Sequence, residues 1–341
     1  MGPPLECAPV DLSICMLAYN GIDFTLPCLA SIGPATGRLK VESILVDNGS
    51  GDGSPAAVEK QPPWVRLVRN DMNCGFSIAV NQGLELATGR HLLVLNNDTR
   101  IVPGCLEAVV DFMDKNPDAG IVTPQLIYED GRLQNSIANF PSFTEIFFGK
   151  TLLRMFFPGK YPSKMVPFEK PVEVESVVGA AMFVRKEVVD KIGGIDEGFF
   201  IFFEETDWCL RARRAGWKNY LLPEAKIIHH QGQTVNRAHT RKRIEYTRSL
   251  FRYFRKNHPA LSPWVRLLFP LKTAFECLFS SLGLLFTLGL SGRARRKTVE
   301  KWGSMFWQLR GCPEDSGLRP PNLKVPPGRE QLRLRAQGEA S

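Results

Sequence analysis

Apolar and polar residues follow two distinct patterns along the first half of the chain. Short apolar runs predict strands, and segments with apolar residues three or four positions apart predict helices. The strands are expected at 12–19, 41–46, 64–68 and 91–95, and the helices at 24–31, 77–87 and 106–113. Strands that alternate with helices at this spacing indicate an α/β fold, with a mostly parallel sheet and helices on both faces.

The second half begins with a long aromatic-rich connection over 135–170. Connections of this length inside a compact domain are usually functional or mobile. We therefore expect either a lid that binds a substrate or a packed satellite subdomain. A helix over 205–215 follows and ends at Gly216. A strand at 227–229 then brings His229 to its end.

The character of the sequence changes after about residue 235. A helix rich in Arg and Lys precedes an apolar stretch over 264–290, whose uncharged part is shorter than the ~20 residues of a spanning helix. This favours an interfacial or re-entrant helix with basic flanks on anionic lipid, over a dimerisation helix or a true span. The predicted parts are a domain over 1–235, a helical segment over 236–312 and a disordered Pro-rich tail over 313–341.

Composition and charge narrow the functional classes. The 341 residues carry a formal net charge of +8, which favours anionic partners. Nucleic acid is not expected, because aromatic patterning typical of RNA-binding domains is missing. No G-x-G-x-x-G follows the first strand, which weighs against a dinucleotide dehydrogenase. The 8 cysteines form no C-x-x-C pair, and the first residues lack the features of a signal peptide, so we expect a cytoplasmic protein.

Candidate chemistry first appears in LLVLNNDT, residues 92–99, where a predicted strand ends in Asn96, Asn97 and Asp98. Asn and Asp often only close a turn by bonding their own backbone. A carboxylate at the C-terminal end of a buried strand is also where open α/β sheets bind ligands. The stretch by itself leaves both interpretations open.

Four blocks in order decide between them. They are LAYN with VDNGSGDGS, then NCGFSIAVNQGLELATG, then LLVLNNDT, and finally GGIDEGFFIFFEETDWCLRARRAGW followed by IIHHQGQT. With these blocks, the region from about 12 to 234 resembles the family 2 glycosyltransferases, and most of all their bacterial rhamnosyltransferase-type branch. The resemblance implies the GT-A fold, a Rossmann-like mixed sheet with helices on both faces that binds a nucleotide sugar.

The resemblance also implies a divalent cation, Mg²⁺ or Mn²⁺, that neutralises the diphosphate leaving group. Asp98 is its expected ligand, although the family's D-x-D motif is reduced here to Asn96-Asn97-Asp98. That departure suggests a site that relies on the diphosphate and one further protein ligand. His229 is the expected second ligand, with His230 as its competitor.

The same blocks imply which residues bind the nucleotide sugar. Asp47 would bind the pyrimidine base, or it would only close a turn before Asn48-Gly49. Asn20 would flank the nucleotide or cap a turn, and Gly75 would allow phosphate to approach a helix N-terminus. The full predicted set is Tyr19, Asn20, Asp47, Asn73, Gly75, Asn81 and Asn97.

The block FFEETD is expected to carry the catalytic base. The family pattern is E-D-x-D, so Glu205 stands where an aspartate is usual, and Glu204 is the alternate. Asp207 and Arg211 are four residues apart on the predicted helix, so we expect a simple ion pair between them. The implied reaction is inverting glycosyl transfer by single displacement.

The donor and acceptor follow from the branch resemblance. We expect thymidine-diphosphate-rhamnose first and UDP-hexoses second, with a polyprenyl-diphosphate-linked saccharide as acceptor in cell-surface polysaccharide synthesis. The protein would then lie peripherally on the inner face of the cytoplasmic membrane. A non-catalytic nucleotide-sugar-binding or membrane-scaffold protein of the same fold is the alternative, which Glu205 argues against.

Overall fold

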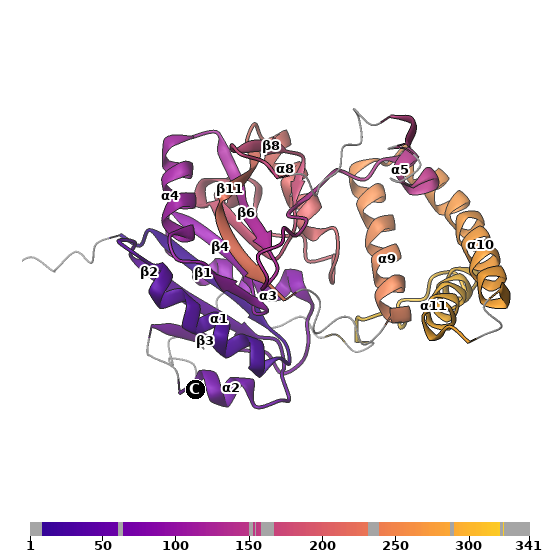
Figure 1. Cartoon of the computed structure of the whole chain (residues 1–341), viewed down its shortest axis with the longest axis horizontal. Helices are drawn as coiled ribbons and strands as arrows, with labels where there is room; N and C mark the ends of the chain where they lie inside the picture. Colours follow the sequence, from indigo (N-terminus) through magenta and orange to yellow (C-terminus); the bar gives the residue numbers. More distant parts are fainter. Residues whose placement is uncertain are drawn as a thin grey trace, which may run out of the picture.

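The computed structural model describes residues 9–60, 64–149, 153, 155–157, 167–230, 239–286, 290–320 and 323. An α/β body forms one side of the molecule, and three long C-terminal helices stand at its other side (Figure 1). The predicted boundary at residue 235 lies outside the described residues, as do most residues of the predicted tail.

A nine-stranded mixed sheet forms the centre of the body, in the order β3-β2-β1-β4-β10-β6-β11-β5, with β8 paired to β11. Strands β1 to β4 run parallel, whereas β10, β5 and β8 pair antiparallel to their neighbours. The strands are β1 (Leu12–Ala18), β2 (Val41–Asp47), β3 (Val65–Arg69), β4 (His91–Asn96), β5 (Thr99–Ile101), β6 (Ala119–Ile127), β8 (Val172–Val174), β10 (Ala181–Arg185) and β11 (Lys218–His229). A separate pair joins β7 (Ile137–Ala138) to β9 (Ser176–Val177).

Helices cover both faces of this sheet because its strands are apolar on both sides. In β4, Leu93 and Leu95 face one core and Leu92 and Val94 face the other. The first core packs α1 (Ile22–Ala35), α2 (Ser54–Val58) and α4 (Cys105–Lys115). The second packs α3 (Phe76–Leu86), α7 (Lys186–Ile192) and α8 (Glu204–Arg214).

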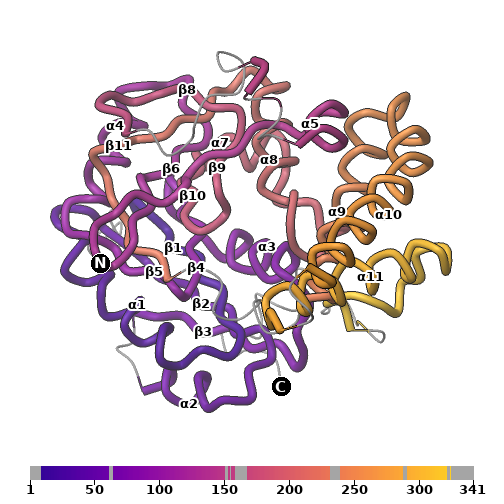
Figure 2. The backbone as a smooth tube through the Cα atoms, turned by 45° about the vertical axis from the view of Figure 1, so that its right-hand side comes forward, coloured from indigo at the N-terminus to yellow at the C-terminus, as the bar shows by residue number. Residues whose placement is uncertain are grey.

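The C-terminal helices are α9 (His239–Asn257), α10 (Ser262–Phe286) and α11 (Gly292–Leu309), and Figure 2 shows them together beside the body. A third apolar cluster joins them to the body, with Phe199 and Phe203 before α8 packed against Tyr253 of α9 and Phe269 of α10. The short helix α5 (Phe143–Phe148), inside the long aromatic connection, also packs against α10.

Most of the elements predicted for the first half of the chain are confirmed, with small shifts at their ends. The sheet is more mixed than the predicted mostly parallel one, since β10 enters it antiparallel between β4 and β6. At the start of the predicted tail, Arg248 of α9 donates a hydrogen bond to the carbonyl oxygen of Pro313 at 3.0 Å, and the bounds of the tail stay a prediction.

Candidate functional site

Asp98 and His229 lie side by side because β5 pairs antiparallel with the end of β11. In this register His229 is opposite Thr99, and the amide of His230 donates to the carbonyl oxygen of Asp98 at 2.8 Å. The imidazole Nε2 of His229 lies 3.5 Å from Oδ1 of Asp98, and both side chains are largely buried. The predicted pair of metal ligands is therefore brought together by the sheet itself.

Gln134 orients the His229 ring. Its Oε1 lies 3.0 Å from Nδ1 of His229, and its Nε2 donates to the backbone oxygen of His229 at 2.6 Å. With a proton on Nδ1 for this hydrogen bond, the lone pair of Nε2 faces Asp98. The competitor His230 instead lies 3.2 Å from Glu129, outside this arrangement. Gln134 was not among the predicted site residues.

This pair fits a divalent cation. Oδ1 of Asp98 is buried and has no hydrogen-bond partner within the described part of the chain, and a carboxylate with an imidazole suits Mn²⁺. No cluster of three or more His, Cys, Asp or Glu ligands occurs among the described residues. Two protein ligands would leave the remaining coordination positions to a diphosphate and water.

The ends of β1 and β2 form a second part of the site. Asp47 is buried at the end of β2, where Oδ2 accepts a hydrogen bond from the amide of Ser50 at 3.1 Å. Its Oδ1 has no partner within the described residues. Asn20, with a φ of 46°, accepts from the amide of Gly51 at 2.9 Å. Asn20 thus holds the loop that follows Asp47, while Oδ1 of Asp47 stays without a partner among the described residues; Tyr19 directly precedes Asn20 at the end of β1.

Asp52 fixes this loop to α1. Its carboxylate accepts hydrogen bonds from the amides of Gly21 at 2.6 Å and Ile22 at 3.0 Å, at the start of the helix. Burial raises the pKa of Asp52, but the bonds from Ser54, Ile22 and Gly21 outweigh it and lower the pKa to about 2. The carboxylate therefore stays ionised as a helix cap.

Two predicted nucleotide ligands, Asn73 and Asn81, form hydrogen bonds within the protein. Asn81 donates to the carbonyl oxygen of Ile195 at 2.8 Å and accepts from its amide at 2.9 Å. Asn73 accepts from Asn48 at 3.1 Å and from the amide of Gly75 at 2.9 Å. The contacts of Asn73 and Asn81 indicate positioning residues rather than direct ligands.

Gly75 needs the room that only glycine gives, but for a different reason from the predicted one. Its φ is 91°, and a Cβ there would lie 2.6 Å from Cδ2 of Phe200. The next amide, that of Phe76, donates to the carbonyl oxygen of Phe200 at 2.7 Å. The loop before α8 therefore approaches Gly75 closely, and the predicted approach of a phosphate stays a prediction.

Asn97 is also held within the protein. Its side-chain amide donates to Oγ1 of Thr25 in α1 at 2.9 Å. Since only this contact engages its side chain among the described residues, Asn97 anchors the loop that carries Asp98.

Glu204 and Glu205 begin α8, directly after two residues with left-handed backbones. Phe202 and Phe203 have φ values of 73° and 67°, which are strained for bulky side chains. Burial raises the pKa of Glu205 to about 7, against hydrogen bonds that lower it. Burial, and then the charge of Glu205, raise the pKa of Glu204 well above its ordinary value.

The two carboxyl groups differ in what they face. Each has an Oε2 without a hydrogen-bond partner within the described chain. Glu205 lines a hollow of about 1280 Å³, whereas Glu204 is 4% exposed and does not line it. A substrate in the hollow could reach Glu205 and not Glu204.

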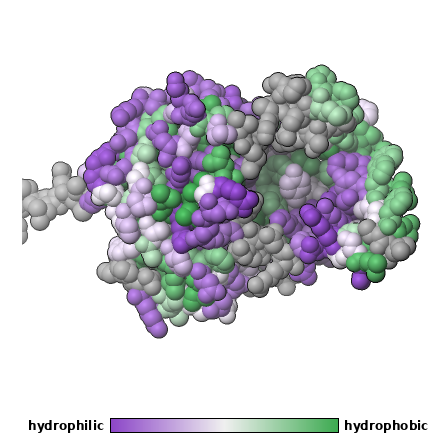
Figure 3. Space-filling view, in the orientation of Figure 1, coloured by the Kyte–Doolittle hydropathy of each residue, from purple (hydrophilic) through white to green (hydrophobic). Residues whose placement is uncertain are grey.

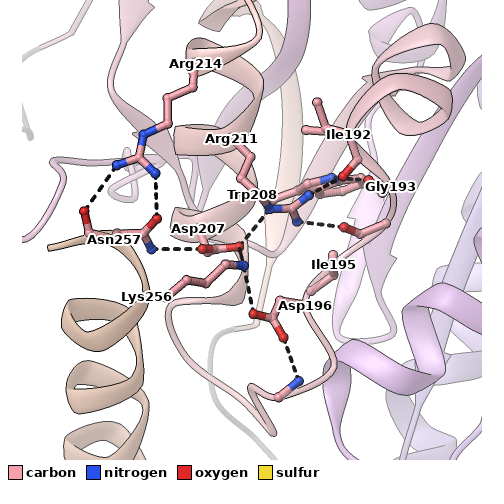
Figure 4. Close-up of polar contacts among 12 residues, drawn as sticks. Ile192, Gly193, Ile195, Asp196, Asp207, Trp208, Arg211, Arg214, Lys256 and Asn257 are labelled. Carbon is pink, nitrogen blue, oxygen red and sulfur yellow. Dashed lines mark hydrogen bonds and ion pairs between the residues drawn. The ribbon is translucent and has the colours of Figure 1, made fainter. Parts of the chain in front are cut away.

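A buried ionic network fixes α8 in place (Figure 4). Asp207 is fully buried and accepts hydrogen bonds from Arg211 at 2.9 Å, Lys256 at 2.8 Å and Asn257 at 2.9 Å. The ion pair of Asp207 with Arg211 is confirmed. The guanidinium of Arg211 also donates to the carbonyl oxygens of Ile192 and Gly194, each at 2.7 Å.

Glu205 and the end of β4, which precedes Asp98, adjoin one segment between β9 and β10. The amide of Asn96, two residues before Asp98, donates to the carbonyl oxygen of Ala180 at 3.0 Å. A Cβ on the neighbouring Gly179 would lie 3.7 Å from Cβ of Glu205. A carboxyl group with a pKa of about 7 and the end of the strand that precedes Asp98 therefore adjoin the same short segment.

Comparison with known proteins shows which protein family this chain belongs to. Residues 13–193 match the model of the family described as glycosyl transferase family 2. The N-acetylglucosaminyl-diphospho-decaprenol L-rhamnosyltransferase of Mycobacterium tuberculosis is 30% identical over 80% of this chain and 92% of its own length. The dTDP-rhamnosyl transferase RfbF of Shigella flexneri is 27% identical over 58% of this chain and 65% of its own length.

A solved structure confirms the fold. The mannosyltransferase PcManGT from Pyrobaculum calidifontis, in complex with GDP-Man and Mn²⁺, superposes with a TM-score of 0.53 at 16% identity, over 92% of this chain and 91% of its own. The chain belongs to glycosyl transferase family 2. It is a glycosyltransferase of the GT-A fold in the rhamnosyltransferase-like branch. Glycosyltransferases of this branch act in polysaccharide biosynthesis.

Proposed function

We propose that this chain is a cation-assisted, inverting glycosyltransferase. It would move a sugar from a nucleoside-diphosphate sugar to a hydroxyl group of a lipid-linked saccharide. The supporting observation is that Glu205 adjoins Gly179, while Asn96, two residues before Asp98 of the Asp98–His229 pair, donates a hydrogen bond to the neighbouring Ala180.

Each residue has a stated part in this reaction. Asp98 and His229 would hold Mg²⁺ or Mn²⁺, which when bound supplies positive charge to the diphosphate leaving group. Asp47, with its free Oδ1, would accept a hydrogen bond from the N–H of the base. Glu205 would take the proton of the acceptor hydroxyl as its oxygen bonds to the anomeric carbon, and the nucleoside diphosphate leaves from the opposite face.

Rhamnose is the first candidate for the transferred sugar, and a polyprenyl-diphosphate-linked saccharide is the candidate acceptor. Both proposals are supported by the mycobacterial relative, whose name gives an L-rhamnosyl donor group and a diphospho-decaprenol acceptor. A thymidine diphosphate carrier is supported by the Shigella relative. UDP-hexoses are the second candidate donors.

We also propose that residues 236–312 associate with the inner face of the cytoplasmic membrane. Helix α10 is long and apolar enough to cross a membrane by length and composition, but Val265, Phe269, Thr273 and Cys277 on one of its faces are buried in the protein. This supports an interfacial helix over a span. The described cysteines are all free, as expected for a reducing compartment.

A thermal-shift panel of nucleotide sugars, with and without Mn²⁺, tests the proposed function. A specific ligand at 100 times its Kd stabilises a protein by ~2.7 kcal/mol. We expect the largest shift with thymidine-diphosphate-rhamnose and Mn²⁺ together. A non-catalytic binding protein would give the same shift but no nucleoside diphosphate release with any lipid-linked acceptor. No shift with any nucleotide sugar would refute the proposal.

A further inference from the structure

The hollow lined by Glu205 continues well beyond that carboxyl group. It lies between the start of α8 and the helices α5, α9 and α10, and Figure 3 shows the molecule hollowed between its body and its C-terminal helices. Its volume of about 1280 Å³ exceeds the ~300–1,000 Å³ typical of small-molecule pockets. The hollow therefore has room for a saccharide beside the proposed base.

The charges that line the hollow balance one another. Four acidic and four basic residues line it, namely Glu145, Glu205, Glu276, Glu300, Lys242, Arg243, Lys272 and Lys301. Arg243 and Lys272 both pair with Glu276, and Arg243 also lies 3.8 Å from Glu300. Because neither sign is in excess, the lining does not attract an ion of either sign. It suits a neutral ligand whose hydroxyl groups both donate and accept hydrogen bonds, such as a saccharide.

Tyr246 of α9 presents an aromatic ring to the hollow next to the proposed base. It lines the hollow and is 47% exposed. Its ring centroid lies 5.7 Å from that of Phe202 and 5.0 Å from that of Phe203, the two residues directly before α8. The hollow desolvates the phenol, and the nearby charge of Glu205 acts in the same direction, so the pKa of Tyr246 is raised.

This position distinguishes Tyr246 from the other exposed aromatic residues of the hollow. Those in the described part of the chain are Phe148 of α5 and Phe275 and Phe279 of α10. Of these four rings, only that of Tyr246 packs against the residues that lead into α8. The C–H groups of a sugar carry partial positive charge and pack on the negative face of an aromatic ring. Tyr246 is therefore the ring best placed to hold a sugar within reach of Glu205.

We propose that Tyr246 binds the saccharide end of the acceptor. A sugar ring lies over the aromatic ring of Tyr246 and presents its hydroxyl group to Glu205. This proposal rests on the proposed function, because it takes Glu205 as the base and a saccharide as the acceptor. The family match ends at residue 193, so a helix outside it would contribute to the choice of acceptor.

Acceptor kinetics test the proposal. The acceptor is N-acetylglucosaminyl-diphospho-farnesol, a short-chain form of the acceptor in the mycobacterial relative's name, and nucleoside diphosphate release is measured with thymidine-diphosphate-rhamnose and Mn²⁺. Tyr246→Ala should raise the KM for this acceptor at least about tenfold, because the sugar loses the face on which it packs. The kcat should stay within about threefold, since binding lost equally from ground and transition states changes only KM. An unchanged KM in Tyr246→Ala would overturn the proposal.

Three further variants separate the ring from other causes. Tyr246→Phe keeps the ring and should leave KM within about twofold of the parent value. Tyr246→Leu keeps apolar packing on Phe202 and Phe203 without a flat ring, so it should raise KM as Tyr246→Ala does, and it serves if Tyr246→Ala does not fold. Trp64→Ala removes a ring of similar exposure, 41%, just before β3 and outside the hollow, and should leave KM unchanged. A KM raised equally in Tyr246→Phe, or in Trp64→Ala, would overturn the role of this ring.

Two further arms separate the saccharide from the lipid and from the donor. Farnesyl diphosphate, which lacks the sugar, should inhibit Tyr246→Ala and the parent protein to the same degree, and weaker inhibition of Tyr246→Ala would assign the ring to the lipid instead. The thermal shift with nucleotide sugar and Mn²⁺ should also be the same in both proteins. If the parent shows no shift or no turnover, the proposed function fails and this proposal fails with it. A normal shift and turnover of the parent, beside an unchanged KM in Tyr246→Ala, rejects only the role of Tyr246.

Discussion

At the residue scale, the site depends on side chains that the protein leaves without partners. Oδ1 of Asp47, Oδ1 of Asp98 and Oε2 of Glu205 are all buried and lack hydrogen bonds within the described chain. A buried polar atom without a partner costs ~1–3 kcal/mol of folding free energy. A bound substrate or cation would supply the missing partners of these atoms. The folding free energy lost at each atom is therefore consistent with ligand binding there.

Gln134 gives a test of the cation pair that does not remove a ligand. Gln134→Ala leaves Asp98 and His229 in place but frees the imidazole to rotate, because the bond to Nδ1 is lost. Loss of such a supporting partner typically lowers metal affinity ~10–100-fold. Calorimetric titration of Mn²⁺ with a nucleoside diphosphate should show this loss in Gln134→Ala. In Asp98→Ala the same titration should show that all metal-dependent affinity is lost. Unchanged metal-dependent affinity in Asp98→Ala would show that Asp98 is not a ligand of the cation.

Glu205→Gln tests the base. The variant keeps size and hydrogen bonding but cannot accept a proton, so turnover should fall by ~10²-fold or more. Donor affinity should stay within a few-fold. In the parent protein, kcat/KM should rise with pH through about 7, where the raised pKa of Glu205 lies, and this limb should vanish in the variant. A dead Glu204→Gln beside an active Glu205→Gln would reassign the base.

Glu204→Gln tests how burial affects stability. The raised pKa of Glu204 means that the folded protein keeps a proton that the unfolded chain releases near its ordinary value of 4.5. Stability from this group is therefore full below that pH and declines as pH rises. Glu204→Gln should melt at a higher temperature than the parent at pH 8 and at the same temperature at pH 4. A higher melting temperature of Glu204→Gln at pH 4 but not at pH 8 would contradict this direction of the pH dependence.

Sequence patterns identified the strand-end residues but not the residues that support them. The strand-end positions of Asp98 and His229 could be predicted because each directly follows or ends an apolar run, whereas their role as ligands came from the family resemblance and stays a prediction. Gln134 could not, since it lies 95 residues from His229 and its own neighbourhood contains no pattern. Gly75 was singled out correctly as special, but its partner, Phe200, is defined only by the folded chain.

At the scale of elements, helix α8 carries the proposed base and is fixed by contacts with α9 and with the loop before it. The network around Asp207 connects it to α9 through Lys256 and Asn257, and to the loop before it through Arg211. The strained backbones of Phe202 and Phe203 persist because the third apolar cluster packs both residues against α9 and α10. The C-terminal helices thereby help to position the active-site helix.

Asp207→Ala should destabilise the protein strongly. It leaves Arg211, Lys256 and Asn257 without their shared buried acceptor, and removal of one member of a buried ion pair costs ~3–5 kcal/mol. Asp190→Ala is the control, because Asp190 pairs with Lys186 at the surface, where a pair contributes ~0–1 kcal/mol. The free energy of unfolding in urea measures both. Losses of similar size would show that the network contributes little.

Strand β6 was not predicted because its sequence carries a conflicting signal. Strand β6 is an apolar run interrupted by Pro124, which argues against a central strand. In the structure Pro124 lies beside a register shift in β11, where the ladder is already irregular. Helix α11 shows Val299, Trp302 and Phe306 at helical spacing, and all three are exposed. This helix lies within the helical segment predicted over 236–312, and its apolar stripe could have given its bounds.

At the scale of the whole molecule, the positive charges of α9 are largely used internally. Arg243, Arg248, Arg252 and Lys256 pair with acidic residues of the protein. These four side chains are therefore less available to anionic lipid than the unpaired basic residues, and the predicted lipid contact of the basic flanks stays a prediction. Truncation after Asn257 would also remove Val265 and Phe269 from the third apolar cluster, so surface charge reversal is the cleaner test of membrane binding.

A second hollow is the candidate for the proposed membrane-binding surface. It has a volume of about 630 Å³ and is lined by Arg241, Arg295 and Arg296, and none of these three has an ion-pair partner within the described part of the chain. Exposed apolar residues at the end of α10 and just beyond it, Leu285, Phe286 and Leu290, precede the start of α11. Free arginines near exposed apolar side chains are typical of a surface that meets lipid headgroups.

Charge reversal at this hollow tests membrane association. Each basic residue near an anionic bilayer contributes ~1 kcal/mol, so Arg295→Glu with Arg296→Glu should weaken co-sedimentation with phosphatidylglycerol vesicles by at least about tenfold. Arg66→Glu with Arg69→Glu in the body changes the net charge equally and should have little effect. Salt should weaken binding of the parent protein as it screens the arginines. Equal loss in both double variants would attribute binding to net charge alone. Full co-sedimentation with neutral vesicles at high salt would instead show that α10 inserts as an integral helix.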